Sequence, residues 1–269
     1  MADHRSCGKV IIAQCVERYD MTKNPLVSVI IPAYNCVRTI EKAIDSALSQ
    51  NVELEVIVVD DCSKDDLDGV MERYGGDPRV IYIKNEHNLG AASSRNKAVL
   101  MARGRYIAYL DADDYWAPDK IRKQLKTVEA GGAVLCCTSR ELMTPEGKLT
   151  GRMIPVNSQI TYEDLLKHNS ISCSSVLIRT EVALEFPMEH EDAHEDYIMW
   201  LRVLKKYQFA CGINEPLLKY RMSNTGKSGG KLHSAWMTFK SYRYMGFGVF
   251  KSCICFISYA LHGVKKYFL

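Results

Sequence analysis

The sequence predicts an α/β fold, with a mostly parallel central sheet that has helices on both faces and a basic amphipathic segment at the C-terminal end. Extended and helical patterns alternate along the chain, and the extended stretches are rich in Val and Ile, as expected for strands that are covered on both sides. The 269 residues, 47% hydrophobic and 25% charged, are enough to bury a large core.

The first part of the chain is expected to alternate strands with helices. A helix predicted over residues 39–50 has apolar residues at helical spacing and Thr39 as its N-cap, and a second over 90–103 opens with small residues. Polar residues follow several strands, at the edge where parallel sheets bind ligands. The strands themselves are predicted in VSVIIPAYN (27–35), LEVIVVDDCS (54–63), VIYIKN (80–85) and GRYIAYLDADD (104–114).

Beyond residue 130 the pattern changes. Residues 133–151 predict two strands that are joined by a turn at 145–147. Residues 171–186 predict a short strand followed by a segment that Thr180 caps. A helix with one apolar face is predicted over residues 197–207.

Two standard phosphate-binding motifs are missing from the sequence. No G-x-G-x-x-G follows the first strand, so the dinucleotide-binding fingerprint is absent. The segment SNTGKSGG (223–230) contains a Gly-Lys-Ser, but a P-loop needs a glycine at the position that Arg221 occupies. A phosphate-containing ligand would have to be held in another way.

Asp111 and Asp113 offer that other way. In an extended chain, residues two apart point to the same side, so these two carboxylates would face one space at the end of a strand. A divalent cation, Mn²⁺ or Mg²⁺, would relieve their repulsion and bridge to a diphosphate. The alternative is that both are solvated turn residues, and that Asp114 starts a helix with Pro118 in its first turn.

The stretch HEDAHED (190–196) is compatible with two different sites. On a helix, H-E-x-x-H would place two histidines for zinc, but the flanking residues are acidic and polar, and no third ligand follows at metzincin spacing. Asp196 instead lies at or just before the first turn of the helix 197–207, where the helix dipole favours an ionised carboxylate that could act as a general base. The alternative is that Glu195 and Asp196 only cap this helix.

Four motifs carry a resemblance to a known family. VSVIIPAYN, VIVVDDCS, NLGAASSRN and YIAYLDADD resemble, in this order and spacing, the motifs of the inverting glycosyltransferases of family 2. The resemblance covers about residues 25–222 and implies the GT-A (nucleotide-diphospho-sugar transferase) fold. It also implies metal-dependent transfer of a sugar from a nucleotide-diphosphate donor, a UDP-sugar by similarity to family members, to a hydroxyl of a saccharide acceptor.

The resemblance assigns roles to seven residues. It implies that Pro32 and Tyr34 lie against the nucleobase, that Asp61 hydrogen-bonds the nucleobase, and that Arg95 lies near the diphosphate. It also implies that Asp111 contacts ribose or sugar, that Asp113 binds the metal, and that Asp196 is the catalytic base. Alternation along the strand leaves open whether Asp60 or Asp61 has the functional role.

The resemblance also divides the chain. Residues 1–24 are expected to form an N-terminal extension and residues 25–222 the GT-A domain. Within that domain, residues 25–120 form the nucleotide-binding half and residues 121–222 the acceptor-binding half. Residues 223–269 form a basic, aromatic tail that associates with membranes.

The charge distribution supports a separate role for the tail. The net charge of the whole chain is +3. No acidic residue follows Glu215, and the nine Lys and Arg residues after it carry +9, so residues 1–215 carry −6. Lys251 and Lys265 bound an uncharged run of 13 residues, which is short of the roughly 20 that span a bilayer. These features predict a segment that lies in an anionic membrane surface. The alternative is a C-terminal helix that packs on the domain.

The ten cysteines include no C-x-x-C pair, and the N-terminal apolar run is too short for an export signal. Both observations favour a cytoplasmic protein, bound peripherally to the inner face of the cell membrane. The acceptor is then expected to be lipid-linked, such as a polyprenyl-diphosphate saccharide of surface polysaccharide synthesis, and no nucleic acid partner is expected. Two other functions remain open, a nucleotidyltransferase and a non-catalytic protein that binds sugar nucleotides or membranes.

Overall fold

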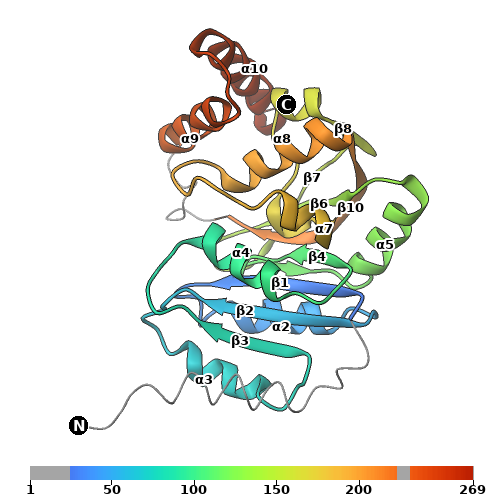
Figure 1. Ribbon diagram of the computed structural model, residues 1–269, viewed down its shortest axis with the longest axis vertical. Coiled ribbons are helices and arrows are strands. Elements are labelled where there is room, and N and C mark those ends of the chain that lie inside the picture. Colours follow the sequence, from blue (N-terminus) through green and yellow to red (C-terminus); the bar gives the residue numbers. More distant parts are fainter. Residues whose placement is uncertain (1–24, 223–230, 269) are drawn as a thin grey trace.

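The computed structural model describes residues 25–222 and 231–268, so the predicted N-terminal extension and the start of the tail lie outside the described residues. Its strands are β1 Val27–Ala33, β2 Leu54–Asp60, β3 Val80–Lys84, β4 Tyr106–Tyr109, β5 Tyr115–Trp116, β6 Leu135–Met143, β7 Leu149–Ile154, β8 Gln159–Thr161, β9 Leu177–Arg179 and β10 Phe209–Arg221. They form one sheet in the order β3-β2-β1-β4-β9-β6-β10-β5, with β7 beside β6 and β8 beside β10 (Figure 1).

The sheet is parallel in its first half and mixed in its second. Strands β3, β2, β1 and β4 run parallel, whereas β9 is antiparallel to both β4 and β6. In the parallel register Ala33 pairs with Asp60 and Ile30 with Tyr109. The polar residues that follow β1, β2 and β4 therefore meet at one edge, as the sequence predicts.

Helices cover both faces of the sheet. They are α2 Ile40–Leu48, α3 Leu67–Met71, α4 Ala91–Met101, α5 Lys120–Gly131, α6 Tyr162–Lys167, α7 Thr180–Glu185 and α8 Glu195–Tyr207, with single 3₁₀ turns η1 Glu72–Tyr74 and η2 Cys173–Ser175. Val29 and Ile31 of β1 pack in the core that includes α2, α3 and α5, whereas Ile30 packs in the core of α4, α7 and α8. Successive β1 side chains enter opposite cores because a strand alternates its two faces.

One local expectation is confirmed and two need correction. Thr39 holds the predicted N-cap position of α2, although its hydroxyl donates to the Cys36 carbonyl oxygen at 3.2 Å and makes no cap bond. Thr180 is the first residue of α7 and donates to the carbonyl of Gly104, so Arg179 stands at the N-cap. Helix α5 starts at Lys120 with Asp119 as N-cap, which leaves Pro118 before the helix rather than in its first turn.

The C-terminal residues form two helices, α9 Lys231–Tyr244 and α10 Val249–Phe268, next to α8 and α6. Tyr242 is fully buried, and its hydroxyl donates to the Leu166 carbonyl oxygen at 2.9 Å. The ring of Tyr259 lies 6.2 Å from that of Tyr197. The tail therefore packs on the acceptor-side half (Figure 1), and no helix within the described ranges is long and apolar enough to cross a membrane.

Candidate active site

A cavity of about 1040 Å³ opens where β1, β2 and β4 end. Six of the seven predicted site residues line it: Pro32, Tyr34, Asp61, Arg95, Asp111 and Asp113. They come from three strand ends and one helix that are far apart in the sequence. The seventh, Asp196, is not among the lining residues and is connected to them through its neighbour Glu195.

The loops after β1 and β2 hold each other in place. Asn35 has a left-handed backbone (φ 50°), and its amide oxygen accepts from the Lys64 N–H at 2.8 Å while its own N–H donates to Ser63 Oγ at 3.1 Å. Asparagine tolerates this backbone better than most residues. The turn leaves Tyr34 at the rim of the cavity with 44% of its surface exposed, so its ring offers a face for a nucleobase.

Asp61 organises the loop that leads into α4. Its buried carboxylate accepts hydrogen bonds from the side chain of Asn85 and from the backbone N–H groups of Leu89 and Gly90, each at 2.8 Å. Asp60 accepts instead from the Ser63 N–H at 2.8 Å and the Tyr82 hydroxyl at 3.1 Å. Of this pair Asp61 lines the cavity, and Asn85 is a supporting residue that no sequence pattern singled out.

Asp111 and Asp113 do not lie in an extended chain, contrary to the argument from alternation. Strand β4 ends at Tyr109, and Asp111 to Asp114 form a turn in which the Asp114 N–H donates to the Asp111 carbonyl oxygen at 3.1 Å. Three aspartates in four residues favour a turn over a strand, because carboxylate side chains compete for backbone N–H groups. Both residues nevertheless line the same cavity.

The carboxylates of this turn are crowded. Burial and the neighbouring Asp111 raise the pKa of Asp113 to about 6. Asp114 is buried, accepts from the Arg221 N–H at 2.8 Å, and has a pKa well above its usual range because of burial and its two aspartate neighbours. Asp114 is therefore an interior residue and not a solvated turn residue.

Arg95 joins the two halves of the site. Its guanidinium is 7% exposed and donates to Asp111 Oδ1 at 2.6 Å from one nitrogen and to Glu195 Oε1 at 3.1 Å from another. The resemblance implies a position near the diphosphate. In the structure Arg95 lines the cavity, and its contacts are these two carboxylates and the Met188 sulfur at 3.8 Å. A planar guanidinium suits this role because its donors bond two acceptors at once.

Asp196 is the second residue of α8, after the N-cap His194. Burial and the adjacent Glu195 raise its pKa to about 6, so burial outweighs the helix dipole that the sequence argument relied on. Glu195 accepts a hydrogen bond from Arg95. Asp196 accepts one from the backbone N–H of the next residue, Tyr197, at 2.7 Å. Of the E-D pair, Asp196 is the one available to accept a proton.

The H-E-x-x-H pattern does not form a metal site. His190 lies outside the helix, has a left-handed backbone (φ 69°), and stacks on the Tyr244 ring at 3.7 Å between centroids. His194 Nε2 lies 3.2 Å from the Ser234 carbonyl oxygen. Within residues 25–222 and 231–268, no three His, Cys, Asp or Glu residues gather as a ready-made metal site.

Comparison with known proteins agrees with this geometry. The family model "Glycosyl transferase family 2" matches residues 28–183. The putative teichuronic acid biosynthesis glycosyltransferase TuaG of Bacillus subtilis is 37% identical over 247 residues, which cover 90% of this chain and 97% of that protein. An Escherichia coli protein named UDP-Glc:alpha-D-GlcNAc-diphosphoundecaprenol beta-1,3-glucosyltransferase WfaP is 36% identical over 90% of this chain and 95% of its own.

Solved structures show the same fold. S. aureus TarS 1-349 in complex with UDP-GlcNAc aligns with a TM-score of 0.68 at 17% identity, over 86% of this chain and 70% of that one. The mannosyltransferase PcManGT of Pyrobaculum calidifontis, in complex with GDP-Man and Mn²⁺, aligns with a TM-score of 0.66 at 18% identity, over 88% and 70% of the two chains. The family match decides against the nucleotidyltransferase and non-catalytic alternatives. The chain belongs to glycosyl transferase family 2 and is a glycosyltransferase with the GT-A fold.

Proposed function

We propose that this enzyme moves a sugar from a UDP-sugar to a hydroxyl of a lipid-linked saccharide in surface polysaccharide synthesis, with inversion and with Mn²⁺ or Mg²⁺. The observation that carries the proposal is the single cavity that collects six predicted donor-site residues and is tied by Arg95 to the E-D pair. The name of TuaG supports a role in biosynthesis of this kind, that of WfaP supports a lipid-linked acceptor, and those of WfaP and the TarS complex support a UDP-sugar.

The donor's nucleoside would bind at the ends of β1 and β2. The exposed ring of Tyr34 would stack on the base, and Pro32 would contact it beside Tyr34. Asp61 Oδ2 accepts one described hydrogen bond, from Gly90, so it could accept another from a base N–H. Asp111, fixed by Arg95, would accept from a ribose or sugar hydroxyl.

The chemistry of the cavity suits a divalent cation. Burial and, after it, the neighbouring Asp111 carboxylate raise the pKa of Asp113, and a cation would relieve the repulsion between the two carboxylates. Asp113 would hold the ion, with the donor diphosphate completing the ligands. When bound, the ion would neutralise the charge that develops on the departing diphosphate.

Asp196 would act as the base. With a pKa of about 6 it is mostly ionised at neutral pH and can take the proton of the acceptor hydroxyl. The oxygen attacks the anomeric carbon as the bond to the diphosphate breaks on the opposite face, which inverts the configuration. Glu195, bound to Arg95, would keep the start of α8 in a fixed position relative to Asp111, which Arg95 also binds.

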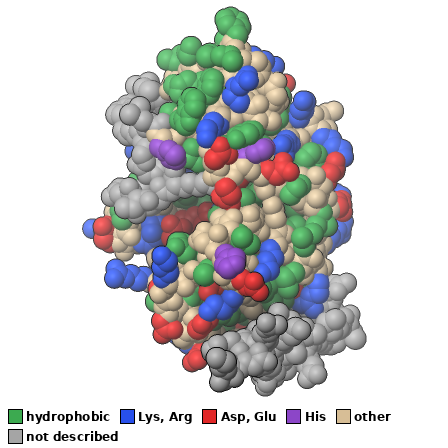
Figure 2. Space-filling view, turned by 60° about the vertical axis from the view of Figure 1, so that its left-hand side comes forward, with side chains coloured by type: hydrophobic (Ala, Val, Ile, Leu, Met, Phe, Trp, Pro, Cys, Tyr) green, Lys and Arg blue, Asp and Glu red, His purple; other side chains and the backbone are tan. Residues whose placement is uncertain are grey.

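The C-terminal helices would bind the membrane that carries the acceptor. One face of α10 is apolar and exposed: Phe250, Ile254, Ile257 and Leu261 are between 53% and 81% exposed and lie three or four residues apart. Hydrophobic side chains gather over these helices at the top of the view in Figure 2. The charge excess after Glu215 suits an anionic leaflet, so we place the enzyme peripherally on the cytoplasmic face.

The test is turnover. Purified enzyme with Mn²⁺, a panel of nucleotide sugars and a lipid-linked acceptor should release nucleoside diphosphate, and EDTA should stop release until Mn²⁺ or Mg²⁺ is restored. Asp113→Asn and Asp196→Asn should each lower the rate by about 10²-fold or more. Near-wild-type transfer by Asp196→Asn would remove the base assignment, and full activity in EDTA would remove the metal.

A further inference from the structure

Besides the aspartates of the strand ends, one glutamate enters the donor cavity from the loop between α7 and α8. Residues 187–194, which join α7 to α8, are called here the acidic strap. Glu191 of this strap lines the cavity, and its carboxylate accepts a hydrogen bond from the backbone N–H of Ala92 in the first turn of α4. It is the only lining residue within the described ranges that comes from the part of the chain beyond Pro145.

The backbone at α4 is shaped to receive Glu191. Gly90 has φ +87°, and a Cβ at this position would lie 2.5 Å from the Glu191 carboxyl carbon. Any larger residue at position 90 would be strained and would also displace the carboxylate. The helix dipole and the N–H groups of the first turn of α4 favour a negative group there. The Glu191 carboxylate is therefore held in a defined position at the start of α4.

The strap is fastened on both sides of Glu191. Toward α4, the Met188 backbone and the Asn96 side chain exchange two hydrogen bonds, of 2.7 and 2.9 Å. Toward α9, Asp192 pairs with Lys240 at 2.7 Å and accepts from the Tyr244 hydroxyl at 2.9 Å.

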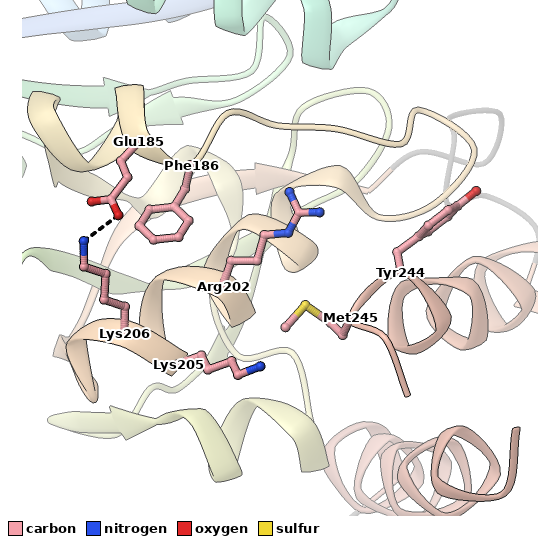
Figure 3. Close-up of a pocket in the computed structure, with 7 residues that line it drawn as sticks. All are labelled: Glu185, Phe186, Arg202, Lys205, Lys206, Tyr244 and Met245. Atoms are coloured by element: carbon pink, nitrogen blue, oxygen red, sulfur yellow. Dashed lines mark hydrogen bonds and ion pairs between the residues drawn. The ribbon is translucent and has the colours of Figure 1, made fainter. Parts of the chain in front are cut away.

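Other contacts hold the strap on the same side. His190 stacks on the Tyr244 ring, and Glu189 pairs with Arg202. Figure 3 shows Arg202 and Tyr244 pointing toward the segment after Phe186. Through these contacts the strap links α9 and α8 to the donor cavity.

We propose that Glu191 is a further substrate-binding residue, whose carboxylate accepts a hydrogen bond from a hydroxyl of the nucleotide sugar. A carboxylate repels the donor's phosphates, and hydroxyls are the donor groups that a nucleotide sugar offers in number, on its ribose and on its hexose. Tyr244 is a positioning residue that acts through Asp192. This inference rests on the proposed function, because it assumes a nucleotide sugar in the cavity.

Glu191→Gln tests the proposal, because glutamine keeps the size and one acceptor oxygen and loses the charge. Its dissociation constants for UDP and for UDP-glucose or UDP-GlcNAc would be measured by calorimetry with Mn²⁺. Glu185→Gln is the matched control, since Glu185 pairs with Lys206 outside both the strap and the cavity. We expect Glu191→Gln to weaken binding about tenfold, from the difference between charged and neutral hydrogen bonds, and Glu185→Gln to leave it within about twofold.

The two ligands separate the two possible hydroxyls. An equal loss for UDP and UDP-sugar assigns the ribose, and a loss confined to the UDP-sugar assigns the hexose. Wild-type affinity of Glu191→Gln for both ligands, at an unchanged melting temperature, would overturn the proposal. A wild-type enzyme that binds neither UDP nor a nucleotide sugar would instead refute the proposed function.

Tyr244→Phe tests the positioning role by removing one bond to Asp192. It should weaken the same ligand by a smaller factor, and it should have no further effect when combined with Glu191→Gln. Independent, multiplying losses in the double variant would show that Tyr244 does not act through Glu191.

Discussion

Arg95 is the residue on which the geometry of the site depends most. It is a buried cation that holds Asp111 of the donor side and Glu195 of the acceptor side within hydrogen-bond distance. Removing one member of such a buried cluster leaves charges unpaired, which typically costs about 3–5 kcal/mol. The same cation also lowers the pKa of Asp196, against the larger effects of burial and Glu195. One side chain thus fixes Asp111 and the start of α8 and influences the pKa of Asp196.

Arg95→Lys should therefore lower kcat by about tenfold or more, because a single ammonium cannot reproduce the planar fork that bonds two carboxylates. Arg103→Lys is the matched control, since Arg103 pairs with the buried Glu55 away from the cavity. Steady-state kinetics and thermal melting of both variants check this. If both variants lost the same activity, the loss would reflect stability rather than the site.

The raised pKa of Asp196 predicts an acid limb in the rate. The base is protonated below a pH of about 6, so kcat at saturating Mn²⁺ should be level above pH 7 and should fall about tenfold per unit below pH 6. Saturating metal keeps Asp113 ionised, so the fall in kcat reports the protonation of Asp196. Nucleoside diphosphate release between pH 5 and 8 measures the limb, and a flat profile down to pH 5 would contradict the assignment.

At the scale of elements, α10 has two unlike faces. Its inner face packs on α9, where the ring of Phe256 lies 6.3 Å from that of Phe239, and on α6 of the domain; Ser252 on this face is fully buried. Its outer face presents large aliphatic and aromatic side chains to solvent, with Phe250 81% exposed. Such a contiguous apolar stripe is costly on a surface with no partner. The two alternatives left by the sequence are therefore compatible, because the helix packs on the protein with one face while its other, apolar face stays exposed.

Replacing Phe250 and Ile257 together by serine should release the enzyme from vesicles. Each side chain contributes up to about 1.5–3 kcal/mol when fully removed from water, so the partition coefficient should fall by at least tenfold. Co-sedimentation with vesicles containing phosphatidylglycerol measures it. Leu100→Ser is the matched control, because Leu100 is 76% exposed on α4. Equal binding by all three proteins would contradict a membrane role for α10.

At the scale of the whole molecule, the parallel half was predictable because β1, β2 and β3 are rich in Val and Ile, β4 is a short apolar run, and polar residues follow each of them. The acceptor half was less predictable. The pairing of β9 with β4 and β6 depends on contacts between distant residues, and the spacing of apolar residues within one segment does not specify them. Predicted residues from separate motifs do meet in one cavity. The bond between Arg95 and Glu195 and the entry of Glu191 join residues about 100 positions apart in sequence, so composition and spacing could not show them.

The anomeric configuration of the product is the most direct test of transfer with inversion. A single displacement with Asp196 as base turns the α-linked sugar of a donor such as UDP-glucose into a β-linked product. NMR of the first product formed, with the donor panel and a lipid-linked acceptor, reads this configuration at the new bond. The account predicts the β anomer from the earliest time point. An α-linked product would contradict inversion and, with it, the role given to Asp196.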